Sequence, residues 1–374
     1  MNHIIIYSFE IYTCLVMGIL LFSCHFISYP PNKLYYQEKI YLGIASLIVG
    51  TGKVLTVYFR GTDLPEIFSV PTLFIASTQA CIFSFLSIYL FHSTYVNKKN
   101  VIKHLLPTVI YMILYFGIIM MYTDKKVYSW KEFLQYRNHP ALLFRLLFAL
   151  TYFIQIIVYT FLFFRERHIF IKKLNNIFSD IDRFHLHWGT RLFFEAGILG
   201  IIVLFFSSYP SYWGDIIFST FLPVFYFVFV IRYINYQSRL SDILVIVKGA
   251  DKRPPANKPV TQPAFHILED KLNAFIQSKK PYLTPGIVIA DIASCLNVPD
   301  RELSYFIKYT YNQNFNTWVN ALRIEHAKHL MAEFPTMSFA EISEQSGFSD
   351  KTKFSRVFKE ITGILYSDYK KQLC

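Results

Sequence analysis

Basic and hydroxyl side chains recur at helical spacing near the C-terminal end of the chain. Within residues 338–363, the outward positions of a helical pattern carry Lys351, Thr352, Lys353 and Arg356. Arg can donate two hydrogen bonds to a guanine edge, while Lys and Thr can bind bases or phosphates. An ordinary amphipathic helix with a solvated charged face would show the same pattern, so the neighbouring elements must decide between these interpretations.

The residues around these side chains predict two short helices joined by a tight turn. Ser338 can cap the first helix, and Glu341, three residues later, can complete a capping box. Gly347 follows where that helix must end, because glycine adopts a positive φ most easily. Ser349 can then cap the second helix. A short helix, a glycine turn and a second helix with a basic outer face are typical of a helix-turn-helix that enters a DNA major groove.

The same pattern occurs once more, earlier in the chain. Residues 297–300 parallel residues 347–350 at an offset of 50, and residues 303–308 parallel residues 354–359 at an offset of 51. Asn312 then stands at the position of Gly363. Between the two copies, residues 315–331 have the periodicity of one long helix. The repeat favours two helix-turn-helix units over an isolated amphipathic pair.

Two such units joined by a long helix resemble the DNA-binding domain of AraC/XylS-type transcription regulators, over residues 266–374. The segments that carry the resemblance are ADIASCLNVPDRELSYFIK, NFNTWVNALRIEHAKHLM and AEISEQSGFSDKTKFSRVFKEITG, of which the last is highly specific. The chain departs from the family at Asn312, where Gly is usual, and at Tyr366, where Pro is usual. We expect the fold to tolerate both, because Asn accepts the left-handed region and Pro at a helix start is helpful but not essential.

The resemblance implies which side chains meet DNA and which partners are involved. The first recognition helix would present Arg301, Ser304 and Tyr305 to double-stranded DNA, and the second would present Lys351, Thr352, Lys353 and Arg356. RNA polymerase is a partner by the same resemblance. A membrane domain fused to such a reader is similar to the membrane-anchored members of this family.

The composition requires a second region of a different kind. The chain of 374 residues is 53% hydrophobic and only 17% charged, which is too apolar for an ordinary soluble protein. Seven apolar runs are each long enough to cross a hydrocarbon core of about 30 Å; they are residues 4–27, 39–59, 68–92, 101–122, 141–164, 191–209 and 214–236. We therefore expect an all-α protein with a seven-span membrane domain over residues 1–236, a Pro- and Lys-rich linker over 237–263, and the DNA-binding domain over 264–374.

The distribution of charge predicts the topology. The first 263 residues hold 24 of the 37 Lys and Arg but only 13 of the 25 Asp and Glu, so the excess positive charge lies mostly outside the DNA-binding domain. Loops on one side of the expected spans carry eleven Lys and Arg against five on the other, which places the richer side in the cytoplasm. We expect a bacterial inner membrane protein with its N-terminus outside and its DNA-binding domain inside. The basic, amphipathic connection over residues 165–190 is expected to lie on the inner membrane surface.

Four charged residues fall in the outer half of the expected spans: Glu10, Lys53, Arg145 and Asp215. Such residues are unfavourable in lipid and usually face the bundle interior or a cavity. They could form ion pairs that hold the helices together, or they could line a pocket for a polar signal, and the sequence favours neither.

These features predict a membrane-embedded, one-component transcription regulator that responds to an unknown small-molecule or membrane signal. Further partners are the membrane lipid and a second copy of the chain in a homodimer. Five scattered Cys without a CxxC pair suggest neither disulfides nor a zinc site, and we expect no catalytic residue, cofactor or metal. The alternatives are a transporter or enzyme-like membrane domain with a DNA-binding tail, and a passive membrane tether for the regulator.

Overall fold

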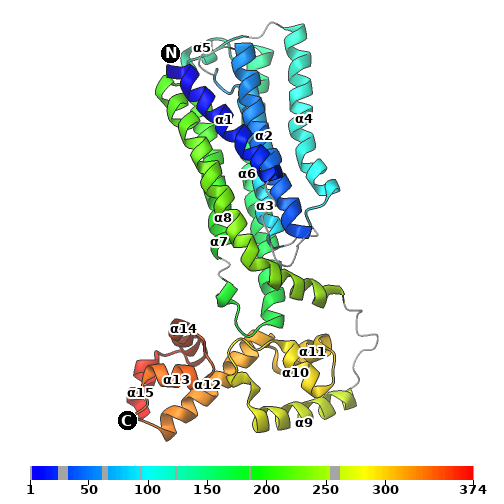
Figure 1. Cartoon of the computed structure of the whole chain (residues 1–374), viewed down its shortest axis with the longest axis vertical. Helices are drawn as coiled ribbons and strands as arrows, with labels where there is room; N and C mark the ends of the chain where they lie inside the picture. The colour runs from blue at the N-terminus through cyan, green and yellow to red at the C-terminus, as the bar shows by residue number, and fades with distance from the viewer. Residues whose placement is uncertain are drawn as a thin grey trace. The chain divides into compact units, whose positions relative to one another are not determined.

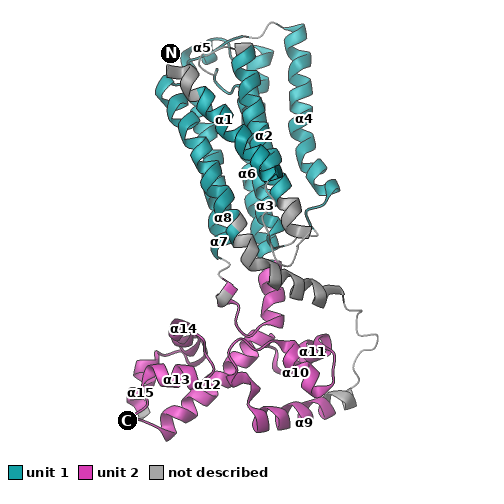
Figure 2. Cartoon of the chain, viewed as in Figure 1, with its two compact units in different colours: residues 1–168, 186–242 teal, residues 169–185, 243–374 magenta. Residues whose placement is uncertain are grey.

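The structure is a computed structural model that describes residues 2–23, 33–60, 66–91, 95–122, 125–184, 187–252 and 262–373. It divides into two compact units, which Figure 2 colours separately. The first comprises residues 1–168 and 186–242, and the second comprises residues 169–185 and 243–374. Every regular element of the described residues is a helix, so the predicted all-α fold class is confirmed.

The first unit is a bundle of long helices that run side by side (Figure 1). In it, α1 packs against α2, α2 against α3, and α3 against both α4 and α7. The helices are α1 (Asn2–Ser23), α2 (Lys33–Arg60), α3 (Val70–Tyr89), α4 (Lys98–Met121), α5 (Trp130–Gln135), α6 (Pro140–Ile177), α7 (His187–Ser208) and α8 (Tyr212–Lys252). The last residues of α6, from 169, and of α8, from 243, belong to the second unit.

Six of the described helices contain an apolar segment long enough to cross a membrane. These helices are α2, α3, α4, α6, α7 and α8. The described apolar part of α1, Tyr7–Ser23, is shorter. Residues 24–27, the end of the first expected span, lie outside the described residues. The predicted count of seven spans is therefore not confirmed.

The residues expected to form a linker begin as helix. α8 continues through position 237 to Lys252, and α9 begins at Gln262. No proline interrupts residues 237–252, and the first one follows at Pro254. Proline blocks a helix where it occurs and restricts the residue before it, so nothing in the sequence ends α8 earlier. Residues 253–261 lie outside the described residues.

The second unit is built from short helices and two longer ones, α9 and α12 (Figure 1). Its elements are η1 (Asp182–Phe184), α9 (Gln262–Lys279), η2 (Pro281–Leu283), α10 (Ile289–Leu296), α11 (Asp300–Tyr311), α12 (Phe315–Glu333), α13 (Phe339–Gln345), α14 (Lys351–Thr362) and α15 (Tyr366–Leu373). The predicted capping box is confirmed, since Ser338 accepts from the Glu341 amide at 3.3 Å and Glu341 accepts from the Ser338 amide at 2.8 Å.

The two helix pairs end and turn in the same way. Asn297 after α10 and Gly347 after α13 both have positive φ angles, of 57° and 79°. Asn312 after α11 and Gly363 after α14 are likewise left-handed caps, with φ angles of 53° and 79°. The repeat in the sequence therefore corresponds to a repeat in backbone geometry, and Asn serves in the first copy where Gly serves in the second.

The long helix α12 belongs to the cores of both helix pairs. Its first half supplies Phe315 and Val319 to a cluster with residues of α9, α10 and α11. Its second half supplies Ile324, Ala327 and Met331 to a separate cluster with α13 and α14. One rigid helix thus carries both pairs and sets the distance between them.

Candidate nucleic-acid interface

The second helix of each pair presents polar side chains from its first two turns. On α14, Lys351, Thr352 and Arg356 are exposed, as predicted, while Phe354 and Phe358 are fully buried in the core. The helix begins differently from expectation, because Asp350 is the cap and accepts from the Thr352 amide at 2.9 Å. An exposed Arg on such a face can bind a guanine edge or a phosphate.

The corresponding face of α11 is less basic and more aromatic. Tyr305 is exposed, and Arg301 and Ser304 are partly exposed. The ring of Tyr305 stacks on that of Tyr309, one helical turn later, with 6.2 Å between centroids. The face of α11 thus carries one guanidinium, one hydroxyl and two neighbouring phenol rings.

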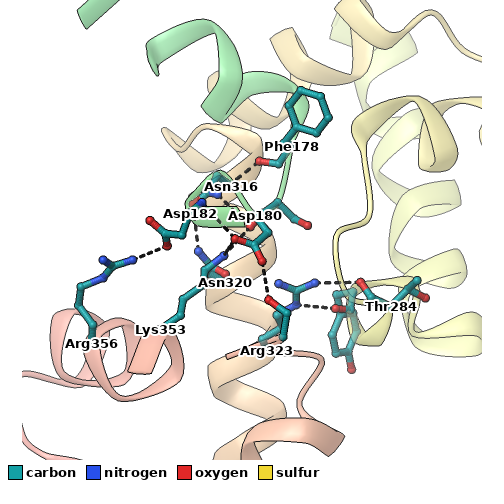
Figure 3. Close-up of polar contacts among 12 residues, drawn as sticks. Phe178, Asp180, Asp182, Thr284, Asn316, Asn320, Arg323, Lys353 and Arg356 are labelled. Carbon is teal, nitrogen blue, oxygen red and sulfur yellow. Dashed lines mark hydrogen bonds and ion pairs between the residues drawn. The ribbon is translucent and has the colours of Figure 1, made fainter. Parts of the chain in front are cut away.

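Lys353 lies elsewhere than the sequence predicted. Its side chain is buried, with Nζ 2.9 Å from Oδ1 of Asp180, and it donates to the Ser179 carbonyl at 3.2 Å (Figure 3). Ser349, expected to cap α14, instead donates its hydroxyl to Oδ2 of Asp180 at 2.6 Å. Both differences have one cause, which is that residues 178–180 reach α14 from a remote part of the chain. No helical pattern within residues 338–363 could reveal these partners.

The charges of this buried pair depend on each other. Burial raises the pKa of Asp180, but the hydrogen bonds from Ser349 and Lys353 outweigh burial, so that pKa lies below its ordinary value. Burial lowers the pKa of Lys353, and the carboxylate of Asp180 opposes this shift. A buried ion pair of this kind is strongly destabilised when one partner alone is removed.

Arg323 is a buried structural residue that the sequence analysis missed. It is 1% exposed on α12, and it donates to the carbonyls of Tyr282 at 2.7 Å and Thr284 at 2.9 Å. Burial lowers its pKa to about 10, against the opposing charge of Asp180. The burial of Arg323 could have been predicted from the sequence, because Arg323 lies four residues after Val319 and four before Ala327, on the buried face of α12.

A cavity of about 140 Å³ lies among the helices of the first unit. Three of the four predicted charged residues, Glu10, Lys53 and Asp215, line it together. Nζ of Lys53 lies 3.0 Å from Oε2 of Glu10 and donates to Ser219 at 3.0 Å. Tyr7 donates to Asp215 and places its ring 4.0 Å from the Lys53 ammonium. Most of the remaining wall is apolar, so the cavity combines an apolar body with one polar, charge-paired corner.

The fourth predicted residue, Arg145, is not among those that line the cavity. It is fully buried, 3.0 Å from Oε2 of Glu66, and donates to the Tyr115 hydroxyl at 3.2 Å. The sequence could not pair Arg145 with Glu66, because the two are distant in the chain. The sequence analysis also did not single out Gln79 and Tyr226, two neutral polar residues in the cavity wall. The Tyr226 hydroxyl donates a hydrogen bond to the side-chain oxygen of Gln79.

Residues 292–372, from α10 to α15, match the protein family described as a helix-turn-helix domain. This part of the chain is a helix-turn-helix domain of the AraC type. The regulatory protein PocR of Salmonella typhimurium is 26% identical over 129 residues, which are 34% of this chain and 42% of PocR. The Msm operon regulatory protein of Streptococcus mutans is 32% identical over 85 residues, which are 23% of this chain and 30% of that protein.

A third relative, the uncharacterized transcriptional regulatory protein YesN of Bacillus subtilis, is 35% identical over 71 residues, or 19% of each chain. The chain therefore spans less than half the length of each of these curated relatives. No solved structure gives a significant match to it.

The AraC-type domain accommodates its departure at Tyr366 through aromatic packing. Tyr366 begins α15 and is 8% exposed. Its ring lies edge-on to Phe339, Phe354 and Phe358, with centroid distances of 4.8, 5.6 and 5.8 Å. A proline at this position could not provide these contacts, which attach α15 to the core of the second helix pair.

Proposed function

We propose that the chain is a membrane-embedded, one-component transcription regulator that binds specific double-stranded DNA through both helix pairs of its AraC-type domain. The observation that carries this proposal is the pair of exposed faces on α11 and α14, with Arg301 on the first and Arg356 on the second. Because α12 takes part in both cores, the two faces are held on one scaffold. Recognition helices of such a scaffold can enter successive major grooves about 34 Å apart.

A map of the chromosomal sites bound in cells tests this proposal and names the regulated genes. The variants Arg301→Ala and Arg356→Ala should each weaken binding to a mapped site by about 1–3 kcal/mol and relax the preference for one base. Lys328→Ala on α12 is the matched control, because it removes one positive charge outside both recognition helices. Equal binding by all three variants and the wild type would refute DNA reading by these side chains.

The six apolar helices support a membrane location for the first unit, and a DNA-binding domain requires access to the cytoplasm. In the proposed topology the N-terminus is outside. The cavity lined by Glu10, Lys53 and Asp215 is the proposed signal site. Its apolar wall and single charge-paired corner fit a small, mostly apolar molecule that carries one polar group. Binding there would separate or reorient the Lys53–Glu10 ion pair.

The signal site is tested with a reporter gene placed under a mapped promoter. Lys53→Ala and Glu10→Ala should change the response of the reporter to growth conditions without changing the DNA affinity of the chain. Ala76→Leu should do the same by filling the cavity while leaving the ion pair intact. Normal responses in all three variants would refute the site. Retained regulation after exchange of residues 1–168 for an unrelated anchor, which leaves residues 169–185 of the second unit in place, would show that the replaced spans are a passive tether.

A further inference from the structure

A short segment that follows α6 and ends at the first residue of η1, residues 178–182, is built into the AraC-type domain; we call it the strap. The Ser179 amide donates to the Ile287 carbonyl at 3.1 Å, beside an antiparallel bridge between Phe178 and Val288. Asn316 on α12 donates to the carbonyls of Phe178 at 3.3 Å and Ser179 at 2.9 Å. Phe178, Ser179 and Asp180 are each at most 3% exposed. The strap therefore has the burial and hydrogen bonding of a core element.

The strap contacts both helix pairs and the helix that joins them. Its backbone binds the residues that lead into α10, and Asn316 ties it to α12. Its two carboxylates then reach the second pair: Asp180 binds Ser349 and Lys353, and Asp182 binds Arg356 (Figure 3). The strap thus binds Lys353 and Arg356 of α14 and also contacts the first helix pair, so it connects the two pairs.

Asp182 lies at the exposed face of α14 that a nucleic-acid backbone would approach, whereas Asp180 is buried. A recognition helix contacts DNA with its first turns, where phosphate oxygens and base edges accept from basic side chains. Asp182 already occupies the Arg356 guanidinium, and a carboxylate and a phosphate repel each other. Asp182 accepts from one terminal nitrogen of the Arg356 guanidinium and adds a negative charge beside it, so strap docking and DNA contact at Arg356 compete through charge.

The two carboxylate contacts differ in strength. Asp182 and Arg356 are both exposed, and such pairs contribute little in water, so DNA can replace this contact. Asp180 and Lys353 are both 4% exposed in their side chains, and this pair anchors the strap. DNA thus displaces the Asp182 contact first, and release of the whole strap also requires the Asp180–Lys353 pair to separate.

We propose that the strap is an autoinhibitory element that competes with DNA for Arg356 of α14. It follows α6 directly, and α6 contains one of the apolar stretches of the first unit, so the chain itself connects the strap to the membrane domain. A change in α6 that withdraws the strap would free Arg356 and remove the contacts that the strap makes with both helix pairs. The inference goes beyond the proposed function but rests on the DNA binding in it.

Asp182→Asn tests the competition in the full-length chain reconstituted in nanodiscs. The probe is a set of short duplexes enriched from a random-sequence pool by the wild-type chain. Asp182 is exposed, so the variant should fold, and loss of its charge should tighten DNA binding about three- to fivefold. Glu333→Gln is the control, because it removes an equal charge at an exposed position at the end of α12. It should leave the affinity within about twofold of the wild type.

Hydrogen exchange at the Ser179 amide reports strap docking independently of affinity. In the wild type this amide is bonded to Ile287, so it should exchange slowly, and saturating duplex should accelerate its exchange. Equal affinities for Asp182→Asn and Glu333→Gln, or Ser179 exchange unchanged by duplex, would overturn the autoinhibition. Failure of the wild type and both variants to bind any duplex would instead refute the DNA binding on which it rests.

Discussion

Gly347, in the turn between α13 and α14, is a position where addition of a single methyl group should strongly destabilise the fold. Its φ angle is 79°, and a Cβ atom there would lie 2.7 Å from the Cα and carbonyl oxygen of Leu283. An L-residue in the left-handed region costs about 1–2 kcal/mol. Because the contact is with backbone, η2 must move as well, which adds about 1–3 kcal/mol. Gly347→Ala should therefore destabilise the second helix pair by about 2–5 kcal/mol.

The chain offers a matched control at Gly363, which caps α14. Its φ angle is also 79°, but nothing lies within 4 Å of where a Cβ would be. Gly363→Ala should thus cost only the backbone strain, about 1–2 kcal/mol. The difference between the two variants isolates the contact with Leu283 from the conformational strain that they share.

Hydrogen exchange of the α13 and α14 amides in the full-length chain measures this difference, because local opening governs their exchange. Since about 1.4 kcal/mol is a factor of ten, Gly347→Ala should accelerate exchange by about 30-fold or more, and Gly363→Ala by no more than about 30-fold. Equal acceleration in the two variants would refute the close approach of Gly347 to η2. It would leave only the left-handed turn as the reason for glycine there.

Three further predictions concern the buried groups of the second unit. Arg323→Met leaves two carbonyls without their donor and should lower the free energy of unfolding by about 2–4 kcal/mol. The measurement is urea unfolding followed by Trp318 fluorescence, in a chain whose other Trp residues are replaced by Phe. An unchanged urea midpoint would contradict this prediction. The pKa of Asp180 is lower when folded, so its contribution to stability is present above its unfolded pKa and is lost as pH falls through the folded one. Asp180→Asn should flatten the acid side of the stability curve, and an unaltered slope would refute the pairing. Tyr366→Ala should cost about 3–5 kcal/mol by leaving an aromatic cavity, whereas a loss below about 1 kcal/mol would show that α15 does not depend on the ring.

Local features of the AraC-type domain were predictable because their causes are local. Ser338 and Glu341 are three residues apart, and the capping box needs nothing else. Gly347 and Asn297 reveal left-handed turns through their residue types. The apolar spacing of Phe354, Val357 and Phe358 predicts their burial, whichever partner covers them.

Features of the candidate sites that join distant segments were predicted only in part. Glu10, Lys53 and Asp215 could be recognised as unusual because each is charged within an apolar run. Their convergence on one cavity, and the separate pairing of Arg145 with Glu66, depend on how the helices pack. Periodicity gives the buried face of a helix but not the residue of another helix that faces it.

The sequence by itself determined the helices, their caps, the duplication within the C-terminal domain and the family resemblance. Each of these depends on residue type and on spacings of a few residues, which the chain carries in linear order. Only the tertiary structure decided the state of Lys353 and Arg356, because Asp180 and Asp182 precede them by more than 170 residues. An outward basic residue and one held by a remote carboxylate have the same local sequence pattern. What separates them is the burial and electrostatic partner that folding supplies.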